Sequence, residues 1–137
     1  MSAWRHATVV ACALLAFGAA AAADVRLEDG WVRASGPTQH ETAAYVRITP
    51  QQALRLVQAR SPWAASVRVR PVAGASAVRL PAGETTQLAP GGPDLLLVGL
   101  RYQVREGDVI PISLVLEDAQ GRRLVRHFGG QGRAPGR

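Results

Sequence analysis

The residues of this sequence whose types and spacing could do chemistry lie directly behind a turn of two prolines and two glycines. The turn occupies residues 90–93, and the short apolar segment after it begins with Asp94 and includes Leu96. Because a strand sends alternate side chains to the same face, Asp94 and Leu96 should share one face while the intervening leucines turn to the core. The outer pair therefore offers one carboxylate, which suits a hard ion, beside a leucine without a lone pair.

Two histidines, His40 and His127, are the other candidate metal ligands beyond residue 23. His40 lies in a polar loop beside Glu41, and a site completed by Glu41 or Asp94 is conceivable. Two scattered imidazoles are a weak metal signal, so a solvated surface histidine is the simpler interpretation of each. The only cysteine is Cys12, so a thiolate metal site or a cysteine nucleophile is not expected in the folded domain. We therefore expect a protein that is not an enzyme.

The first 23 residues have the pattern of a cleaved signal peptide. A basic pair at 5–6 precedes an apolar run over 7–20, and alanines fill 21–23 before the expected cleavage site. Cys12 lies inside the apolar run rather than behind it, so a lipid anchor is not expected there. The remaining 114 residues (137 less 23) have the size of one domain. We expect a periplasmic protein without a membrane span in its mature form.

All 16 basic residues are arginine, against 10 acidic residues, which gives a formal net charge of +6. The arginines are spread along the chain and aromatic residues are few, so nucleic-acid binding is not expected. A coding preference for arginine explains the composition, and electrostatic attraction to an acidic partner or an anionic membrane is the functional alternative. Trp63 is interpreted as a plug over one end of the fold or as an exposed partner-binding anchor.

Short apolar segments separated by turn signals predict an all-β domain, because no long segment has a helical period. The expected strands are 25–34, 42–49, 54–59, 66–70, 77–80, 85–88, 94–98, 109–117 and 122–128. The pattern is typical of an antiparallel β-sandwich with about seven to nine strands. The domain is expected to span residues 24–128. Residues 129–137 contain almost nothing to bury and are expected to form a disordered tail.

A series of short motifs resembles the periplasmic copper chaperone family PCu(A)C. The motifs occupy residues 30–33, 43–46, 61–62, 80–83, 90–92, 98–100 and 106–108, in the order and spacing of that family. The resemblance implies a cupredoxin-like antiparallel β-sandwich with Greek-key connections. It also implies a protein that carries Cu(I) toward the copper centre of a respiratory oxidase, with an oxidase assembly protein or another periplasmic protein as partner. We expect the protein to be a monomer.

The resemblance further implies a copper site of two histidines and two methionines, which suits Cu(I) because that ion favours soft ligands. The first histidine position is occupied by Arg70, and the His-x-Met pair is replaced by Asp94 and Leu96. The remaining methionine position falls on Val69 or Val72. None of these side chains suits Cu(I), so this chain is expected to be a divergent member without the family's copper ligands. Arg70 and Asp94 should instead face each other as an ion pair.

Two functions follow from these observations. The first is a copper-chaperone-like protein, linked by resemblance to copper delivery and oxidase maturation, with weak or no copper binding of its own. The alternative is a periplasmic protein-interaction module whose arginine-rich face docks an acidic partner or a membrane surface. Clustering of the arginines on one face would favour the second, and an even scatter would not.

Overall fold

The protein, as a computed structural model, is described over residues 24–134, and the expected signal segment 1–23 lies outside the described residues. Within this range the chain forms strands and turns only. The strands are β1 (Val25–Arg33), β2 (Glu41–Pro50), β3 (Leu54–Arg60), β4 (Ala64–Arg70), β5 (Val78–Leu80), β6 (Thr86–Gln87), β7 (Asp94–Leu100), β8 (Val109–Asp118) and β9 (Arg123–Arg133). The predicted all-β class and the predicted number of strands are confirmed.

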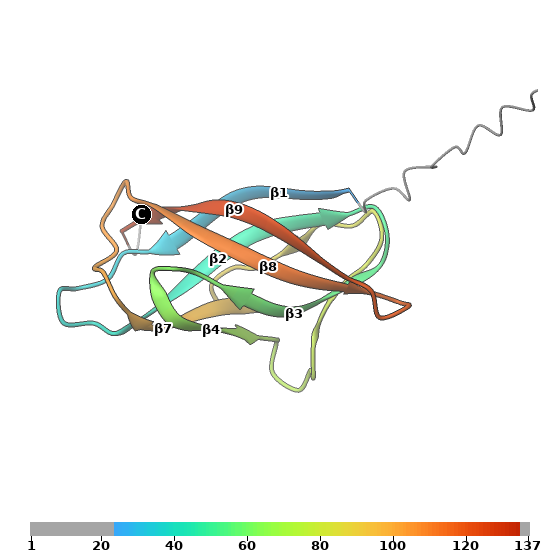
Figure 1. Cartoon of the computed structure of the whole chain (residues 1–137), viewed down its shortest axis with the longest axis horizontal. Helices are drawn as coiled ribbons and strands as arrows, with labels where there is room; N and C mark the ends of the chain where they lie inside the picture. The colour runs from blue at the N-terminus through green and yellow to red at the C-terminus, as the bar shows by residue number, and fades with distance from the viewer. Residues whose placement is uncertain (1–23, 135–137) are drawn as a thin grey trace, which may run out of the picture.

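The strands join into a barrel-like ring. They pair in the order β1-β9-β8-β3-β4-β7-β2-β6, and β1 also pairs with β2, so seven strands close on themselves. Short β5 adds to β3, and β6 adds to β2. In Figure 1, β1, β8 and β9 run along one side of the molecule, and β3, β4 and β7 run along the other. The hydrogen bonds therefore link all strands in one sheet where the sequence suggested two packed sheets.

The hydrophobic core lies inside the ring and consists of alternate side chains of the longer strands. Leu95 and Leu97 of β7 are fully buried, whereas Asp94 and Leu96 are only half-buried on the outer face. The largest buried side chains are Ile48, Leu80, Leu88, Leu95, Leu97, Ile110, Ile112, Leu114 and Leu116. This two-residue period is the one that the sequence predicted, and it directs Asp94 and Leu96 outward.

The turn before β7 takes the form that its composition requires. Gly91 has a φ of 84°, a left-handed conformation that glycine adopts without steric cost. The amide of Gly92 donates to the carbonyl of Ala89 at 2.9 Å, and the amide of Ala89 donates to the carbonyl of Pro93 at 3.2 Å. These bonds bring β7 into register immediately at Asp94.

The end of the chain corrects the expected domain boundary. Residues 129–133, expected to be disordered, continue β9, which pairs in parallel with β1 through Trp31 and Gln131. A Cβ atom on Gly132 would overlap the carbonyl oxygen of Arg105, so glycine allows the two backbones to approach. The composition did not predict this strand because its glycines are packed against backbone atoms, whereas a composition argument counts only apolar side chains. Residues 135–137 lie outside the described residues.

Candidate functional site

The predicted ion pair between Arg70 and Asp94 is confirmed. Arg70 ends β4, Asp94 begins β7, and the two residues are direct partners across the antiparallel ladder. The guanidinium donates two parallel hydrogen bonds, Nε to Oδ1 and Nη2 to Oδ2, each of 2.6 Å. Hydrogen bonding to Asp94 raises the pKa of Arg70, against the opposing effect of partial burial. Arg70 therefore remains charged at neutral pH, and the fork geometry occupies both carboxylate oxygens of Asp94.

The outer face beside this pair is hollowed into a polar groove of about 530 Å³, which we call the β2–β7 groove. It is lined by Arg33, Gln39, His40, Glu41, Thr42, Ala43, Arg70 and Leu96. The structure thus brings His40 and Glu41 to the same groove as Arg70 and Leu96, two of the positions at which the resemblance implied copper ligands. The groove contains the guanidinium groups of Arg33 and Arg70 and the carboxylate of Glu41, and the carboxylate of Asp94 lies beside it as the partner of Arg70. Positive and negative charges balance, so the groove has no net negative charge that would attract a cation.

Arg33 is a groove residue that the sequence analysis did not single out. It lies on β1, and its Nη2 is 3.4 Å from the hydroxyl of Tyr45 on β2. The Tyr45 ring is held in turn by Trp31, at 4.4 Å between ring centroids. Among the described residues, Nε of Arg33 is buried without a hydrogen-bond partner. The available signal was the two-residue spacing of Trp31 and Arg33, which places both on one face of β1.

The other candidate residues lie elsewhere. Val69 packs against the core, whereas Val72 is 49% exposed in the loop after β4. His127 lies on β9, where its Nδ1 is 2.7 Å from the Oγ of Ser113. Neither β8 nor β9 contributes a residue to the β2–β7 groove. Within residues 24–134, no three side chains of the His, Cys, Asp and Glu types gather as a metal site would require.

Trp63 combines features of both interpretations made from the sequence. Its indole is partly buried and packs against the core cluster. Its outer edge meets Tyr102 in a T-shaped contact at 5.2 Å between centroids, and Tyr102 is 58% exposed. Trp63 therefore acts as packing for the end of the barrel while supporting an exposed aromatic ring.

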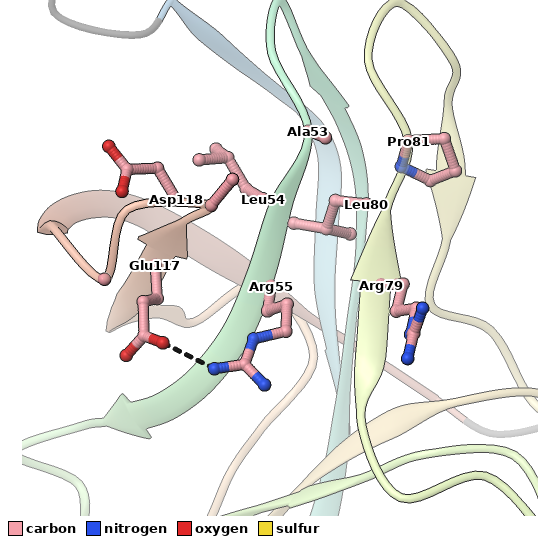
Figure 2. Close-up of a pocket in the computed structure, with 10 residues that line it drawn as sticks. Ala53, Leu54, Arg55, Arg79, Leu80, Pro81, Glu117 and Asp118 are labelled. Carbon is pink, nitrogen blue, oxygen red and sulfur yellow. Dashed lines mark hydrogen bonds and ion pairs between the residues drawn. The ribbon is translucent and has the colours of Figure 1, made fainter.

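A second pocket, of about 560 Å³, lies between β3, β5 and the β8–β9 turn. Figure 2 shows Leu54 and Leu80 in this pocket and Arg55 reaching toward Glu117. Glu117 accepts a hydrogen bond from Arg55 and a longer one, of 3.3 Å, from Arg123. The hydrogen bond from Arg55 lowers the pKa of Glu117, against the opposing effect of desolvation. Arg55 and Glu117 therefore neutralise each other inside this pocket, and Asp118 pairs with Arg122 beside it.

This ion pair makes a prediction about acid stability. Because the pKa of Glu117 is lowered on folding, its contribution is present above the unfolded value, about pH 4, and is lost as the pH falls through the folded value. The Glu117→Gln variant should therefore lose less of its melting temperature between about pH 5 and pH 2 than the natural chain. Thermal unfolding followed by circular dichroism across this range measures the difference. If the melting temperatures of the two proteins fell in parallel as the pH was lowered, the arginine partners would not stabilise the ionised form of Glu117.

A comparison with a protein family identifies the chain over most of its length. The sequence pattern of the LpqE-like family, described as putative lipoprotein LpqE-like, matches residues 25–124. The putative lipoprotein Lxx21020 of Leifsonia xyli subsp. xyli is 30% identical over 119 residues, which are 77% of this chain and 72% of that protein.

Solved structures show the same fold. The apo PCuAC domain of PmoF1 superposes with a TM-score of 0.69 at 21% identity, covering 81% of this chain and 94% of that domain. The copper-bound PCuAC domain of PmoF2 gives 0.68 at 22% identity, with coverage of 83% and 97%. The Cu(I) form of DR1885 from Deinococcus radiodurans gives 0.57 at 27% identity, with coverage of 87% and 84%. The chain has the fold of PCuAC domains and belongs to the LpqE-like family of putative lipoproteins.

Proposed function

We propose that this chain is an exported copper-chaperone-like protein that has given up the copper ligands of its relatives. Its role in copper delivery and oxidase maturation is then exerted through protein contacts. The likeness to PCuAC domains, two of which are the copper-bound PmoF2 domain and the Cu(I) form of DR1885, supports the connection with copper. The observation that carries the loss of the ligands is the bidentate pair of Arg70 and Asp94 on the outer face of β4 and β7.

The chemistry of this pair argues against a resident Cu(I) ion. A guanidinium group is charged at every accessible pH and repels a cation placed beside it. The carboxylate of Asp94 is already committed to that guanidinium, and Leu96 has no donor atom. The one methionine of the chain is Met1, so the domain supplies no thioether. An imidazole remains at His40, and a single imidazole is a weak site for a soft ion.

Export to the cell envelope is part of the proposal. The description of the family and of the Leifsonia relative as putative lipoproteins supports it. We infer cleavage after residue 23, with a mature domain that extends to the end of β9 and acts as a monomer in the periplasm. The described residues contain no helix long and apolar enough to cross a membrane.

Competition for Cu(I) tests the proposal directly. The mature chain, residues 24–137, is titrated against a chromophoric Cu(I) chelator under reducing conditions. We expect no transfer of copper at chelator strengths that report a dissociation constant below about 1 μM. Stoichiometric transfer in the nanomolar range would contradict the loss of the site, and an unchanged signal from His40→Gln would then exclude the remaining groove imidazole as the ligand.

The alternative of a general arginine-rich face is not favoured by the charge distribution. Within residues 24–134, the arginines seen in ion pairs with acidic side chains come from five different strands and one turn. These residues are Arg26, Arg47, Arg55, Arg70, Arg122 and Arg123. The paired arginines are therefore spread over the barrel rather than gathered on one face, and docking by arginine would have to use a smaller surface.

A further inference from the structure

One small pocket gathers arginines without any acidic side chain in its lining. The pocket, of about 340 Å³, lies at the β3–β4 turn and is lined by Arg60 and Arg101 among mostly small residues. Its other polar side chains are Gln58, Ser61 and Ser66. The pocket therefore presents two positive charges and several neutral hydrogen-bonding groups, a set that is complementary to an anion.

These two arginines differ from those that the fold neutralises. Arg60 donates a hydrogen bond of 3.3 Å to the amide oxygen of Gln58, a neutral group. Neither Arg60 nor Arg101 forms an ion pair with any carboxylate in the described part of the chain, whereas six other arginines do. Both side chains belong to exposed residues. Their charge is thus available to a group from outside the molecule.

Each of the two arginines is followed closely in the sequence by an aromatic residue. Trp63 follows Arg60 in the β3–β4 turn, and Tyr102 follows Arg101 after β7. The amide of Arg101 donates to the carbonyl of Trp63 at 2.9 Å, which ties the two segments together. In Figure 1 the β3–β4 turn and the segment that leaves β7 lie at the same end of the barrel. We call Arg60, Trp63, Arg101 and Tyr102 the arginine–aromatic patch.

We propose that the arginine–aromatic patch is a docking site for an acidic segment of a partner protein. A carboxylate enters the pocket between Arg60 and Arg101, and a neighbouring apolar side chain rests on the exposed ring of Tyr102. Arginine, tyrosine and tryptophan are the residues most enriched at the energetic centres of protein interfaces. Trp63 is held by the core, so Tyr102 is presented on a rigid support and loses little freedom on binding.

The charge distribution favours a protein segment over a membrane. Anionic bilayers recruit broad clusters of about four to eight basic residues. Here only two arginines share the pocket, which is fewer than such a cluster contains. A single carboxylate matches a two-arginine pocket, because guanidinium groups bind carboxylates in a fork geometry. This site lies apart from the β2–β7 groove, since the two share no lining residue.

Peptide binding to the folded mature chain tests the proposal without copper. The probe is a fluorescein-labelled peptide with two adjacent aspartates beside a leucine, measured by fluorescence anisotropy at low salt. We expect saturable binding tighter than about 1 mM, and a loss of at least about tenfold in the Arg60→Gln/Arg101→Gln variant. Tyr102→Ala should weaken binding by a smaller factor. Raising the salt to about 0.5 M should weaken binding further, because the pocket is exposed.

The matched control is Arg26→Gln/Arg79→Gln, which removes the same charge from β1 and β5. This control should bind the peptide within about twofold of the natural chain. Equal binding losses in both double variants would reduce the site to net charge and overturn the proposal. No saturable binding below about 1 mM would also overturn it. The proposal would also be overturned if a peptide with asparagines in place of both aspartates bound with equal affinity. Stronger binding to phosphatidylglycerol vesicles that depends on Arg60 and Arg101 would overturn it as well.

Discussion

The triple variant Arg70→His/Asp94→His/Leu96→Met is expected to convert this domain into a Cu(I)-binding protein. Residues 70 and 94 are direct cross-strand partners, and residue 96 follows 94 on the same outer face. Two imidazoles and one thioether would therefore converge on one point of the surface, and these are the ligands that Cu(I) favours. The affinity for Cu(I) should rise at least about a hundredfold over the natural chain, or about 2.7 kcal/mol. Competition against a chromophoric chelator measures the change.

The same experiment decides where a fourth ligand can be placed. Val69 packs inward against the core, whereas Val72 is exposed in the loop that follows Arg70. Adding Val72→Met to the triple variant should therefore tighten Cu(I) binding again. Adding Val69→Met should leave the affinity unchanged and lower the free energy of unfolding, because a longer side chain must be accommodated beside the core. The alternative left open by the sequence is thereby resolved by measurement.

A variant without imidazole or thioether groups controls for the loss of the ion pair. Arg70→Gln/Asp94→Asn/Leu96→Ile removes both charges and offers only amide groups, which do not suit a soft ion such as Cu(I). It should not bind Cu(I), and its stability should lie within about 1 kcal/mol of the natural chain, because exposed ion pairs contribute only about 0.2–1 kcal/mol. If the His/His/Met variant folded and still failed to compete for Cu(I), the assignment of these positions to the family's copper site would be wrong.

Local patterns were sufficient for the elements that alternate clearly. The buried leucines of β7 and the isoleucines and leucines on one face of β8 recur at every second residue. This spacing is the one that a strand produces, because its successive side chains point to opposite faces. The ion pair of Arg70 and Asp94 was also predictable, because the resemblance assigned both residues to positions whose side chains converge. In the structure this convergence follows from the strand register, which makes the two residues direct cross-strand partners.

The groove and the arginine–aromatic patch were not predictable in the same way. Both depend on register between segments distant in the chain, such as Tyr45 beside Arg33, or Arg101 hydrogen-bonded to Trp63. No short-range pattern encodes which strands become neighbours in a closed ring. The polar residues of these surfaces also alternate with core residues in the ordinary way, so composition does not distinguish them from a solvated face.

The last segment of β9 shows how a rule from composition can fail. Its glycines suggested disorder because glycine has no side chain to bury. In the structure the amide of Gly132 donates to the carbonyl of Asp108 at 2.7 Å, and the amide of Gly107 donates to the carbonyl of Gly132 at 3.0 Å. These contacts place backbone against backbone at a distance that a side chain would prevent. The stabilising groups are hydrogen bonds and the burial of neighbours such as Val32 and Val104, both 0% exposed.

Deletion of residues 129–137 is therefore expected to destabilise the domain strongly. It removes the parallel pairing of β1 with β9 and uncovers Val32 from the side of Gly130, where an added Cβ would lie 2.7 Å from a Val32 methyl group. Partial exposure of Val32 and Val104 should lower the free energy of unfolding by about 3 kcal/mol or more. Urea denaturation followed by tryptophan fluorescence measures the loss, with Trp31 reporting directly on the strand that is released.

Deletion of residues 135–137 alone is the matched control, and it should leave the unfolding curve unchanged because β9 remains complete. Gly132→Ala should reproduce part of the loss, by about 1–3 kcal/mol, since the added methyl meets the backbone of Arg105. Gly36→Ala, where an added Cβ meets nothing within 4 Å, should be nearly neutral. If the longer deletion matched the shorter one in stability, residues 129–133 would be a tail resting on the barrel rather than a strand that closes it, and the ring would end at Phe128.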